Sequence, residues 1–306
     1  MGSVFRLRLP ATSANLGAAF DTAAVALGFH LEIEAEIAES YSIAATGRNA
    51  DICSLAEDAA IEGNLILATY ARLLEREGVV VPPLAMKMHN QIPLGMGCGS
   101  SAAGRLAAIA LAVHFGELDW SSQQILAEAC ALEGHPDNAA ACWLGGLVIA
   151  SCEGQTVHCA RVEPPAEWRV LVVIPTEPLA TSKARAVLPA EYSRVDAVAN
   201  VQAASLLGLA FAQGRGDLLR PAMNDRIHQP YRAEICPLLP RLLPLAGSHG
   251  VIGAALSGAG PSVLLIVSGV NAVAEATDAV LQALGSDLDA EILVTDFECQ
   301  GASSGL

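Results

Sequence analysis

Positive charge and aromatic side chains are scarce in this sequence. Its 306 residues include 17 lysines and arginines against 32 acidic residues, which gives a net charge of −15 at pH 7. So acidic a chain repels nucleic acid and anionic membranes, and neither is an expected partner. Aromatic residues make up only 4% of the chain, so alanine, leucine and valine must supply most of the core. An anionic ligand would need local positive groups such as backbone N–H clusters, helix N-termini, a metal ion or a few arginines.

Metal-binding cysteine pairs and targeting segments are also missing. The eight cysteines include no C-x-x-C pair, which argues against a zinc site and favours reduced thiols in a cytosolic protein. The first residues, MGSVFRLRLP, contain no apolar leader segment, and the apolar run at 106–116 is too short to cross a bilayer. We therefore expect a cytoplasmic protein without a membrane partner.

The apolar patterning predicts a mixture of strands and helices without strict β-α-β alternation. Alternating or continuous apolar runs predict strands, and i, i+3, i+4 spacing between capping residues predicts helices. Strands are expected at 4–10, 29–39, 84–92, 145–154, 168–175, 251–269 (two strands) and 290–297, and helices at 64–78, 101–114, 121–134, 195–214 and 272–285. This pattern favours an α+β fold over a doubly wound sheet. A change of composition near Pro164–Pro165 predicts two lobes, residues 1–164 and 165–306.

One glycine-rich loop, PLGMGCGSSAAG at 93–104, lies between a predicted strand and a predicted helix. Such a loop presents free N–H groups and the positive end of the helix dipole, and Ser100 or Ser101 is the expected N-cap. The loop has no lysine after Gly99, so it is not a Walker A loop, and its glycine spacing differs from G-x-G-x-x-G. By itself the segment fits a capped buried helix as well as a phosphate-binding loop.

Other polar segments accompany this loop. They are PATSANLGAAFD (10–21), LEGHPDNAAA (132–141), TSKARAVLP (181–189), NDRIHQPYR (224–232) and ALSGAGPS (255–262). Each has an ordinary structural explanation, as a turn with local side-chain bonds, a helix end, a surface arginine or a wide hairpin. Their combination is more informative than any one of them, because together they supply serine hydroxyls, carboxylates and arginines to one chain.

Taken together, the segments resemble the GHMP kinase superfamily. PATSANLGAAFD, PLGMGCGSSAA and GALSGAGPS match its three motifs in order, and the resemblance covers nearly the whole chain. HPDN at 135–138, TSKARAVLP and IHQPYR are most similar to the homoserine kinases within it. The resemblance implies an N-terminal lobe like ribosomal protein S5 domain 2, a ferredoxin-like C-terminal lobe and an active site between them. It also implies phosphorylation of L-homoserine by ATP, on the route to threonine.

The resemblance implies a set of ATP and magnesium contacts. Ser101 and Glu133 would bind Mg²⁺ and take part in catalysis, with Glu128 as a weaker alternative to Glu133. The residues implied to bind ATP are Asn64, Pro93, Gly95, Gly97, Cys98, Gly99, Ser100, Ser101, Ser257, Gly258 and Gly260. This chain departs from the family pattern at Ala18-Ala19, Cys98 and Gly104, which puts the fine geometry of the loops in question.

The resemblance also implies an amino-acid pocket. Asp21 would bind the ammonium group, and Arg185 and Arg232 would bind the carboxylate, since a guanidinium can contact a carboxylate in bidentate fashion. The substrate-binding set is Asn15, Asp21, His135, Asn138, Thr181, Arg185 and Arg232.

Asn138 occupies a position where related sugar and mevalonate kinases place an aspartate. An amide cannot act as a base, so the resemblance implies catalysis by positioning and electrostatics without a dedicated side-chain base. Asp137 is expected to point away from the pocket. The alternatives are a kinase of this superfamily with another small alcohol substrate and a relative that binds ATP without catalysis. A homodimer is the expected assembly.

Overall fold

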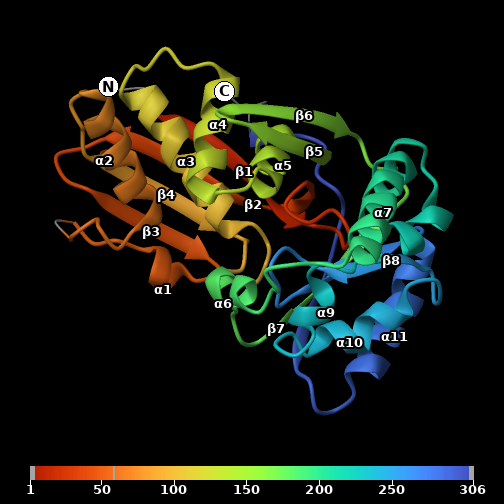
Figure 1. Cartoon of the computed structure of the whole chain (residues 1–306). Coiled ribbons are helices and arrows are strands. Elements are labelled where there is room, and N and C mark those ends of the chain that lie inside the picture. The colour runs from red at the N-terminus through yellow and green to blue at the C-terminus, as the bar shows by residue number, and fades with distance from the viewer. Residues whose placement is uncertain (1–3, 58, 303–306) are drawn as a thin grey trace.

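The computed structural model describes residues 4–57 and 59–302, which form two sheets with helices packed against them (Figure 1). This arrangement confirms the predicted α+β class. The strands are β1 Phe5–Ala14, β2 Ala23–Ile37, β3 Ser42–Gly47, β4 Leu84–Asn90, β5 Leu147–Glu153, β6 Thr156–Val162, β7 Arg169–Pro175, β8 Val251–Leu256, β9 Val263–Val267 and β10 Ala290–Thr295. The helices are α1 Ala50–Cys53, α2 Leu65–Glu77, α3 Ser100–Phe115, α4 Ser122–Glu133, α5 Asp137–Leu144, α6 Thr181–Ala186, α7 Arg194–Ala212, α8 Leu219–Ala222, α9 Gln229–Arg232, α10 Leu238–Leu242 and α11 Val273–Leu284.

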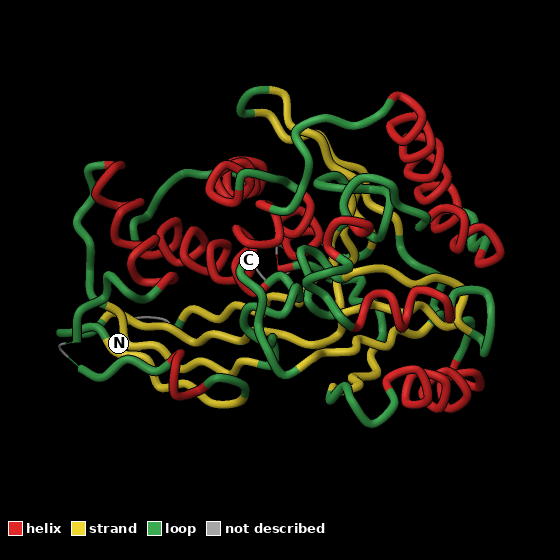
Figure 2. Tube along the Cα trace, turned by 60° about the horizontal axis from the view of Figure 1, so that its bottom comes forward, coloured by secondary structure: helices red, strands yellow, loops and turns green. Residues whose placement is uncertain are grey.

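The larger sheet is built around β2. This 15-residue strand pairs antiparallel with β1, β4 and β5, while β3 joins parallel to β4 and β6 pairs with β5. Helices α2 to α5 pack together and against this sheet, and the turned view in Figure 2 shows helices gathered on one side of its strands. Strands β3 and β6 lie at the two edges of this sheet and have many exposed residues, as expected for edge strands.

The smaller sheet has the strand order β10-β7-β9-β8 with antiparallel pairing throughout. In chain order this is 4-1-3-2, the order of a ferredoxin-like lobe, and it confirms the predicted architecture of the C-terminal part. The sheets change between Val162 and Arg169, around Pro164–Pro165. A domain boundary at residue 164 nevertheless remains a proposal, because one apolar cluster includes residues of both sheets.

Several helix ends follow directly from the sequence. The Asn64 side chain accepts hydrogen bonds from the backbone of Ile66 and Leu67 at the start of α2, and Gly78 ends that helix with φ of 69°. Ser121 and Gln124 form a reciprocal capping box at the start of α4. These caps satisfy the N–H groups that the first turn leaves without helical partners, which is why these two predictions agree with the structure within a residue or two.

Several details differ from the sequence-based expectation, among them the start of β2 at Ala23 and the short helices α1, α8, α9 and α10. The first strand does not end at Pro10 but continues to Ala14, because a bulge between Pro10 and Ala11 absorbs the proline within the ladder. Gly99, not a serine, is the N-cap residue of α3, with φ of 73°. Strands β3 and β6 were not predicted, since β3 is short and alanine-rich and β6 is a mostly exposed edge strand without regular apolar alternation.

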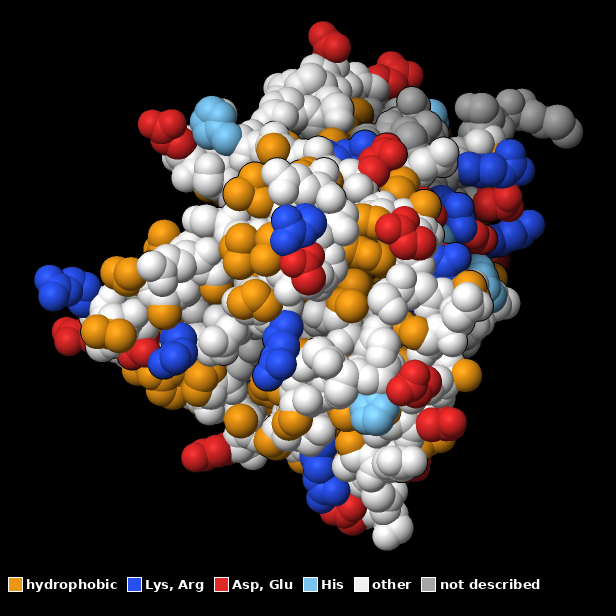
Figure 3. All heavy atoms as spheres, turned by 90° about the vertical axis from the view of Figure 1, so that its right-hand side faces the viewer, with side chains coloured by type: hydrophobic (Ala, Val, Ile, Leu, Met, Phe, Trp, Pro, Cys, Tyr) orange, Lys and Arg blue, Asp and Glu red, His pale blue; other side chains and the backbone are white. Residues whose placement is uncertain are grey.

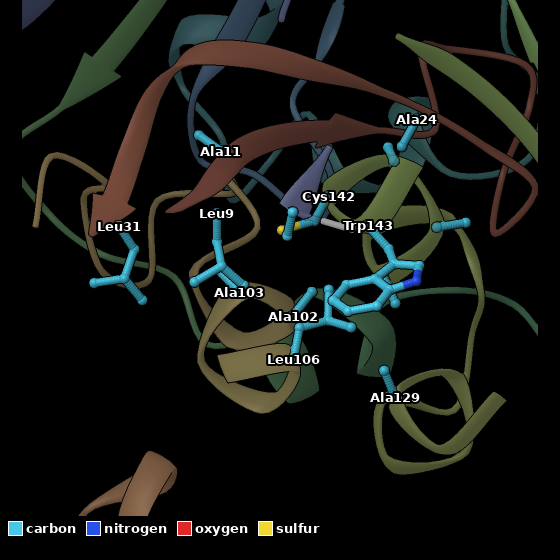
Figure 4. Packing of buried hydrophobic residues seen from close by; sticks show 14 of the residues in the cluster. Leu9, Ala11, Ala24, Leu31, Ala102, Ala103, Leu106, Ala129, Cys142 and Trp143 are labelled. Atoms are coloured by element: carbon cyan, nitrogen blue, oxygen red, sulfur yellow. The ribbon is translucent and has the colours of Figure 1, made fainter. Parts of the chain in front are cut away.

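The core beneath the larger sheet uses small side chains to bring helices close to strands. Figure 4 shows Leu9 of β1, Ala103 and Leu106 of α3, Ala129 of α4 and Trp143 of α5 converging in one cluster. Trp143 is fully buried, and its indole N–H donates to Ser122 Oγ at 2.8 Å. Close approach of this kind is possible because alanine adds little bulk to the facing helix surfaces. As a result, the first turn of α3 stays fixed relative to β1.

Helix α7 links the two parts of the molecule through Asn200. The buried side chain of Asn200 donates to Ala18 O at 2.7 Å and accepts from Arg226 N at 2.8 Å. The nearby turn is equally tight, because a Cβ on Gly17 would lie 2.0 Å from Met223 O. The segment at 15–22 is therefore held by residues that lie some 200 positions later in the chain.

Helix α7 also presents apolar residues to solvent, chiefly Val195, Val198, Val201 and Leu209. Within the described part of the chain, α7 is the one helix whose length and composition would allow it to cross a membrane. Core helices of soluble proteins meet the same criteria. The side of the molecule that carries α7 in Figure 1 faces the viewer in Figure 3, where hydrophobic patches lie between scattered charges. The opposite face of α7 buries Asn200, Leu207 and Phe211 in the protein.

Asn200→Leu should lower the free energy of unfolding by about 2–4 kcal/mol, because it leaves the buried Ala18 carbonyl and Arg226 N–H without partners. Equilibrium urea unfolding measures this change. The matched control is Gln202→Leu, an exposed position on the same helix, which should change stability by no more than about 0.5 kcal/mol. A loss below about 1 kcal/mol for Asn200→Leu would contradict the bridging role of this side chain.

Candidate active site

One cavity of about 650 Å³ lies where the two sheets approach each other. It is lined by residues from the loops at 15–21 and 95–101, from α3, α4, α5 and α6, and from the turn at 258–260. Most of the residues that the sequence singled out meet here: Asn15, Asp21, Asn64, Gly95, Gly97, Gly99, Ser100, Ser101, Glu133, His135, Asn138, Thr181, Arg185, Arg232, Gly258 and Gly260. Segments separated by up to about 245 residues therefore share one cavity.

The glycine-rich loop packs main chain against main chain. Gly97 and Gly99 have φ of 76° and 73°, and a Cβ on Gly97 would lie 2.2 Å from Ser257 O. A Cβ on Gly99 would lie 1.9 Å from Thr12 Oγ1. These positions need glycine for both conformation and space. The loop leads straight into the N-terminus of α3, whose first N–H groups and dipole favour an anion.

Ser101 and Glu133 lie together at the start of α3 and the end of α4. Ser101 Oγ donates to Glu133 Oε1 at 2.7 Å, and Arg105 Nε forms an ion pair with the same oxygen at 3.0 Å. Glu128, the alternative carboxylate, instead forms a bidentate pair with Arg76 and is not among the described lining residues. The two carboxylates are five residues apart on α4 and so lie on different faces of the helix, and Glu133 is the one that contacts Ser101.

Asn138 is held by two neighbours. Thr12 Oγ1 lies 2.7 Å from Asn138 Oδ1, and Asn138 Nδ2 donates to Asp137 Oδ1 at 3.3 Å. A carboxylate can only accept, so the nitrogen of the amide must face Asp137 and the Thr12 hydroxyl must donate to the amide oxygen. The orientation of the Asn138 side chain is therefore set by strand β1 on one side and by its own helix on the other.

Asp137 does not point away from the cavity, contrary to the sequence-based expectation. It is among the lining residues, and its Oδ1 lies 2.6 Å from both His135 Nδ1 and Asn138 N. Burial lowers the pKa of His135, but the hydrogen bond and charge of Asp137, together with the charge of Asp21, outweigh burial and raise it. Asp137 thus holds both the His135 imidazole and the Asn138 amide, its neighbours in the HPDN segment.

Asp21 and Arg185 form a bidentate ion pair across the cavity. Arg185 donates to the two Asp21 oxygens at 2.8 and 3.0 Å, and this hydrogen bonding raises the pKa of Arg185. Asp21 is held in turn by Asn15, whose Oδ1 accepts from Asp21 N at 2.9 Å and whose Nδ2 donates to Gly258 O at 2.7 Å. Asn15 therefore positions the Asp21 turn and ties it to the turn at 258–260.

Arg232 is a buried cation, only 1% exposed, beside this pair. It bonds Ala184 O and His228 Nδ1 at 3.1 Å each, and among the described residues no carboxylate lies within ion-pair distance of it. Burial and the charge of Arg185 lower the pKa of Arg232. Arg185 and Arg232 both lie 5.5 Å from the centre of the Phe20 ring. Such a guanidinium favours an anionic ligand, because an uncompensated buried charge is costly.

Comparison with known proteins identifies the family of this chain. Residues 64–146 match the N-terminal domain of GHMP kinases, and residues 209–287 match their C-terminal domain. A homoserine kinase of Solibacter usitatus is 41% identical over 285 residues, which cover 92% of each chain. A homoserine kinase of Deinococcus radiodurans is 39% identical over 260 residues, 85% of this chain and 83% of that one.

The chain belongs to the homoserine kinase family of the GHMP kinases. The crystal structure of a homoserine kinase from Cytophaga hutchinsonii superimposes with a TM-score of 0.83 and covers 98% of this chain and 97% of that one. Its sequence identity is 24%, so it supports the fold alone. Membership confirms the predicted two-lobe GHMP kinase fold, and a kinase of this family uses ATP.

Three residues expected at the ATP site of this family member are buried next to the cavity and are not among its described lining residues. They are Pro93, Cys98 and Ser257. The Cys98 carbonyl accepts from Thr12 N, and burial raises the pKa of its thiol to about 12, which keeps it neutral. The Ser257 hydroxyl bonds Ser13 Oγ at 2.9 Å and Gly97 O at 2.7 Å. These contacts support the glycine-rich loop next to the cavity.

Sequence reasoning missed Thr12, Asp137 and His228 as parts of the site. The Nδ1 atom of buried His228 accepts from Arg232, so its Nε2–H donates to Gly17 O at 2.8 Å. Burial lowers the pKa of His228, which keeps it in this neutral form. A signal was present in each case, since all three are polar residues within motifs that also contain predicted ligands.

Thr12→Val should lower kcat by about 10- to 100-fold with a smaller change in KM for ATP, because it removes the hydroxyl that orients Asn138. Steady-state kinetics with both substrates measure this. Thr12→Ser keeps the hydroxyl and should remain close to the unmodified enzyme. Equal kinetics for the valine and serine variants would contradict a positioning role for Thr12.

Proposed function

We propose that this protein transfers the γ-phosphoryl group of ATP to the hydroxyl of L-homoserine and so forms O-phospho-L-homoserine. The carrying observation is the buried Arg232, which has no carboxylate partner among the described residues and lies beside the Asp21–Arg185 pair. A zwitterionic amino acid supplies a carboxylate for the two arginines and an ammonium group for Asp21. Family membership supports the same substrate.

Another small alcohol is a weaker alternative. A hydroxy acid without an amino group would satisfy the arginines but would separate Asp21 from Arg185 without offering Asp21 a cation. The cost of leaving one of these charges unpaired favours a ligand with both charges. A relative without catalytic activity is also disfavoured, because Ser101, Glu133 and Asn138 are all present in the cavity.

Mg²⁺ fits the residues at the start of α3. Ser101 Oγ and Glu133 Oε1 are hard oxygen donors that lie 2.7 Å apart, and Glu133 Oε1 already pairs with one cation, Arg105. We propose that Ser101 and Glu133 would hold Mg²⁺. A bound magnesium ion would neutralise charge on the triphosphate.

The glycine-rich loop would bind the triphosphate through backbone N–H groups and the α3 dipole. Asn64 and the lining residues near it would bound the nucleoside end of the cavity. Gly258 and Gly260 would close the opposite side, where their turn contacts the loop at Gly97.

Catalysis is proposed to proceed without a side-chain base. Asn138, fixed by Thr12 and Asp137, would orient the substrate hydroxyl toward the γ-phosphorus. A new O–P bond forms as the bond between the γ-phosphorus and the β–γ bridging oxygen breaks, and ADP leaves. The transition state is loose, so the hydroxyl proton can depart late, to a phosphoryl oxygen or to water. His135 and Thr181 would complete the substrate side of the pocket.

Assembly and location remain proposals as well. We propose a homodimer in the cytoplasm with no nucleic-acid or membrane partner. Light scattering coupled to size-exclusion chromatography measures the assembly directly, and a monomer at micromolar concentration would contradict it.

ADP release should be fast with L-homoserine and slower by about 100-fold or more in kcat/KM with 4-hydroxybutanoate or 3-aminopropan-1-ol. The first analogue lacks the ammonium group and the second lacks the carboxylate, so each leaves one charge of the pocket unpaired. Equal rates for homoserine and 4-hydroxybutanoate would overturn the assignment of Asp21.

Arg185→Ala should raise KM for homoserine by about 100-fold while KM for ATP changes little, because the arginine lies on the substrate side of the cavity. The control is Arg226→Gln, which breaks an exposed pair with Asp196 outside the cavity and should leave both constants unchanged. Turnover of Arg185→Ala equal to that of the unmodified enzyme would eliminate the carboxylate-binding role.

A further inference from the structure

Arg105 is a cation inside the cavity that neither the motifs nor the proposed mechanism uses. It is one of three arginines among the described lining residues, together with Arg185 and Arg232. The other two lie on the amino-acid side, where Arg185 pairs with Asp21 and Arg232 is buried. The lysines of the chain, Lys87 and Lys183, are not among the described lining residues. Arg105 is thus the lining arginine that belongs to α3 itself, one turn after Ser101.

The position of Arg105 follows from helix geometry. It lies four residues after Ser101 on α3, so the two side chains share a face of the helix. Long side chains on a helix lean toward its N-terminus, and this direction brings the guanidinium over the first turn. There, Arg105 Nε and Ser101 Oγ both contact Glu133 Oε1, at 3.0 and 2.7 Å.

Glu133 needs a cationic partner in this position. Its side chain is only 8% exposed, and its carboxylate faces the loop that would receive the triphosphate. A largely buried carboxylate next to a polyphosphate would repel it, because charge–charge interactions are strong where water is partly excluded. Arg105 supplies the missing charge from the neighbouring helix.

We propose that Arg105 substitutes for the divalent cation at Glu133. Its guanidinium neutralises this carboxylate while no metal is bound, so the cavity accepts ATP without metal. When a metal ion neutralises Glu133 instead, the contribution of Arg105 to nucleotide binding is lost. This inference rests on the proposed ATP and magnesium site and adds a role for a residue outside its ligand set.

Isothermal titration with the β,γ-imido analogue of ATP tests the proposal, because binding is measured without turnover. The titrations are run with EDTA and with excess Mg²⁺. Arg105→Gln should weaken metal-free binding by about tenfold, since Glu133 then repels the triphosphate, and should change binding with Mg²⁺ by less than about twofold. Arg105→Lys keeps the charge and should recover most of the metal-free affinity.

Two outcomes for Arg105→Gln would overturn the proposal. Equal weakening with and without Mg²⁺ would mean that Arg105 contacts the nucleotide itself or supports the local fold. Unchanged binding in both conditions would mean that the pair has no electrostatic role. The control is Arg76→Gln, which breaks the neighbouring Arg76–Glu128 pair outside the cavity and should leave both affinities unchanged.

Glu133→Gln separates this proposal from the magnesium assignment. Glu133→Gln should abolish the increase in affinity for the ATP analogue that Mg²⁺ provides. If the increase persists, Glu133 is not the metal ligand, but the comparison of metal-free binding between Arg105→Gln and the unmodified protein remains valid. The double variant Arg105→Gln/Glu133→Gln should bind the metal-free analogue about as well as the unmodified protein, because the repelling carboxylate is gone. A tenfold loss that persists in the double variant would overturn the role of Arg105.

Discussion

Direct contact between three main-chain turns is the constraint on which the whole site depends. The loop at 95–99, the segment at 12–21 and the turn at 257–260 touch one another with hardly any side-chain volume between them. An added Cβ on Gly97 would lie 2.2 Å from Ser257 O, while Gly258 N donates to Ala14 O and Thr12 N donates to Cys98 O, at 3.1 Å each. This closeness is what lets the three segments line one cavity. The alanine-rich core behind α3 extends the same principle, because small side chains hold the helix N-terminus in register with β1.

The positions of its few cations are a second constraint on this acidic protein. With 17 basic residues against 32 acidic ones, the chain places three arginines around one cavity, each in a different state. Arg185 is paired with Asp21, Arg105 with Glu133, and Arg232 is buried against carbonyl groups, an imidazole and an aromatic ring. The rest of the positive potential comes from backbone N–H groups and a helix dipole, which need no charged side chain.

Much of the fold and the membership of the site could be predicted from sequence, but the connections within the site could not. Asn64, Gly78 and Ser121 mark helix ends through local bonds, so these predictions agree with the structure. The extension of β1 to Ala14 was not predicted, because a proline such as Pro10 normally ends a strand. Only the bulge in the structure shows how β1 continues past it. Thr12 and Asn138 are 126 residues apart, and no local pattern links them. The choice between Glu128 and Glu133 depends on which face of α4 meets α3, which is a property of packing.

The turn at 15–21 has a consequence for the way the two halves of the molecule work together. Gly258 and His228 bind it at Asn15 and Gly17, and Asn200 binds it at Ala18, so most of its anchors belong to the second half of the chain. Binding of a ligand at Asp21 and the stability of the contact between the two halves are therefore coupled, and such coupling is reciprocal. A ligand that tightens this turn strengthens the junction between the halves, and any change that loosens the junction costs the ligand the same free energy. Residues at the junction therefore contribute to ligand binding even where they do not contact the ligand.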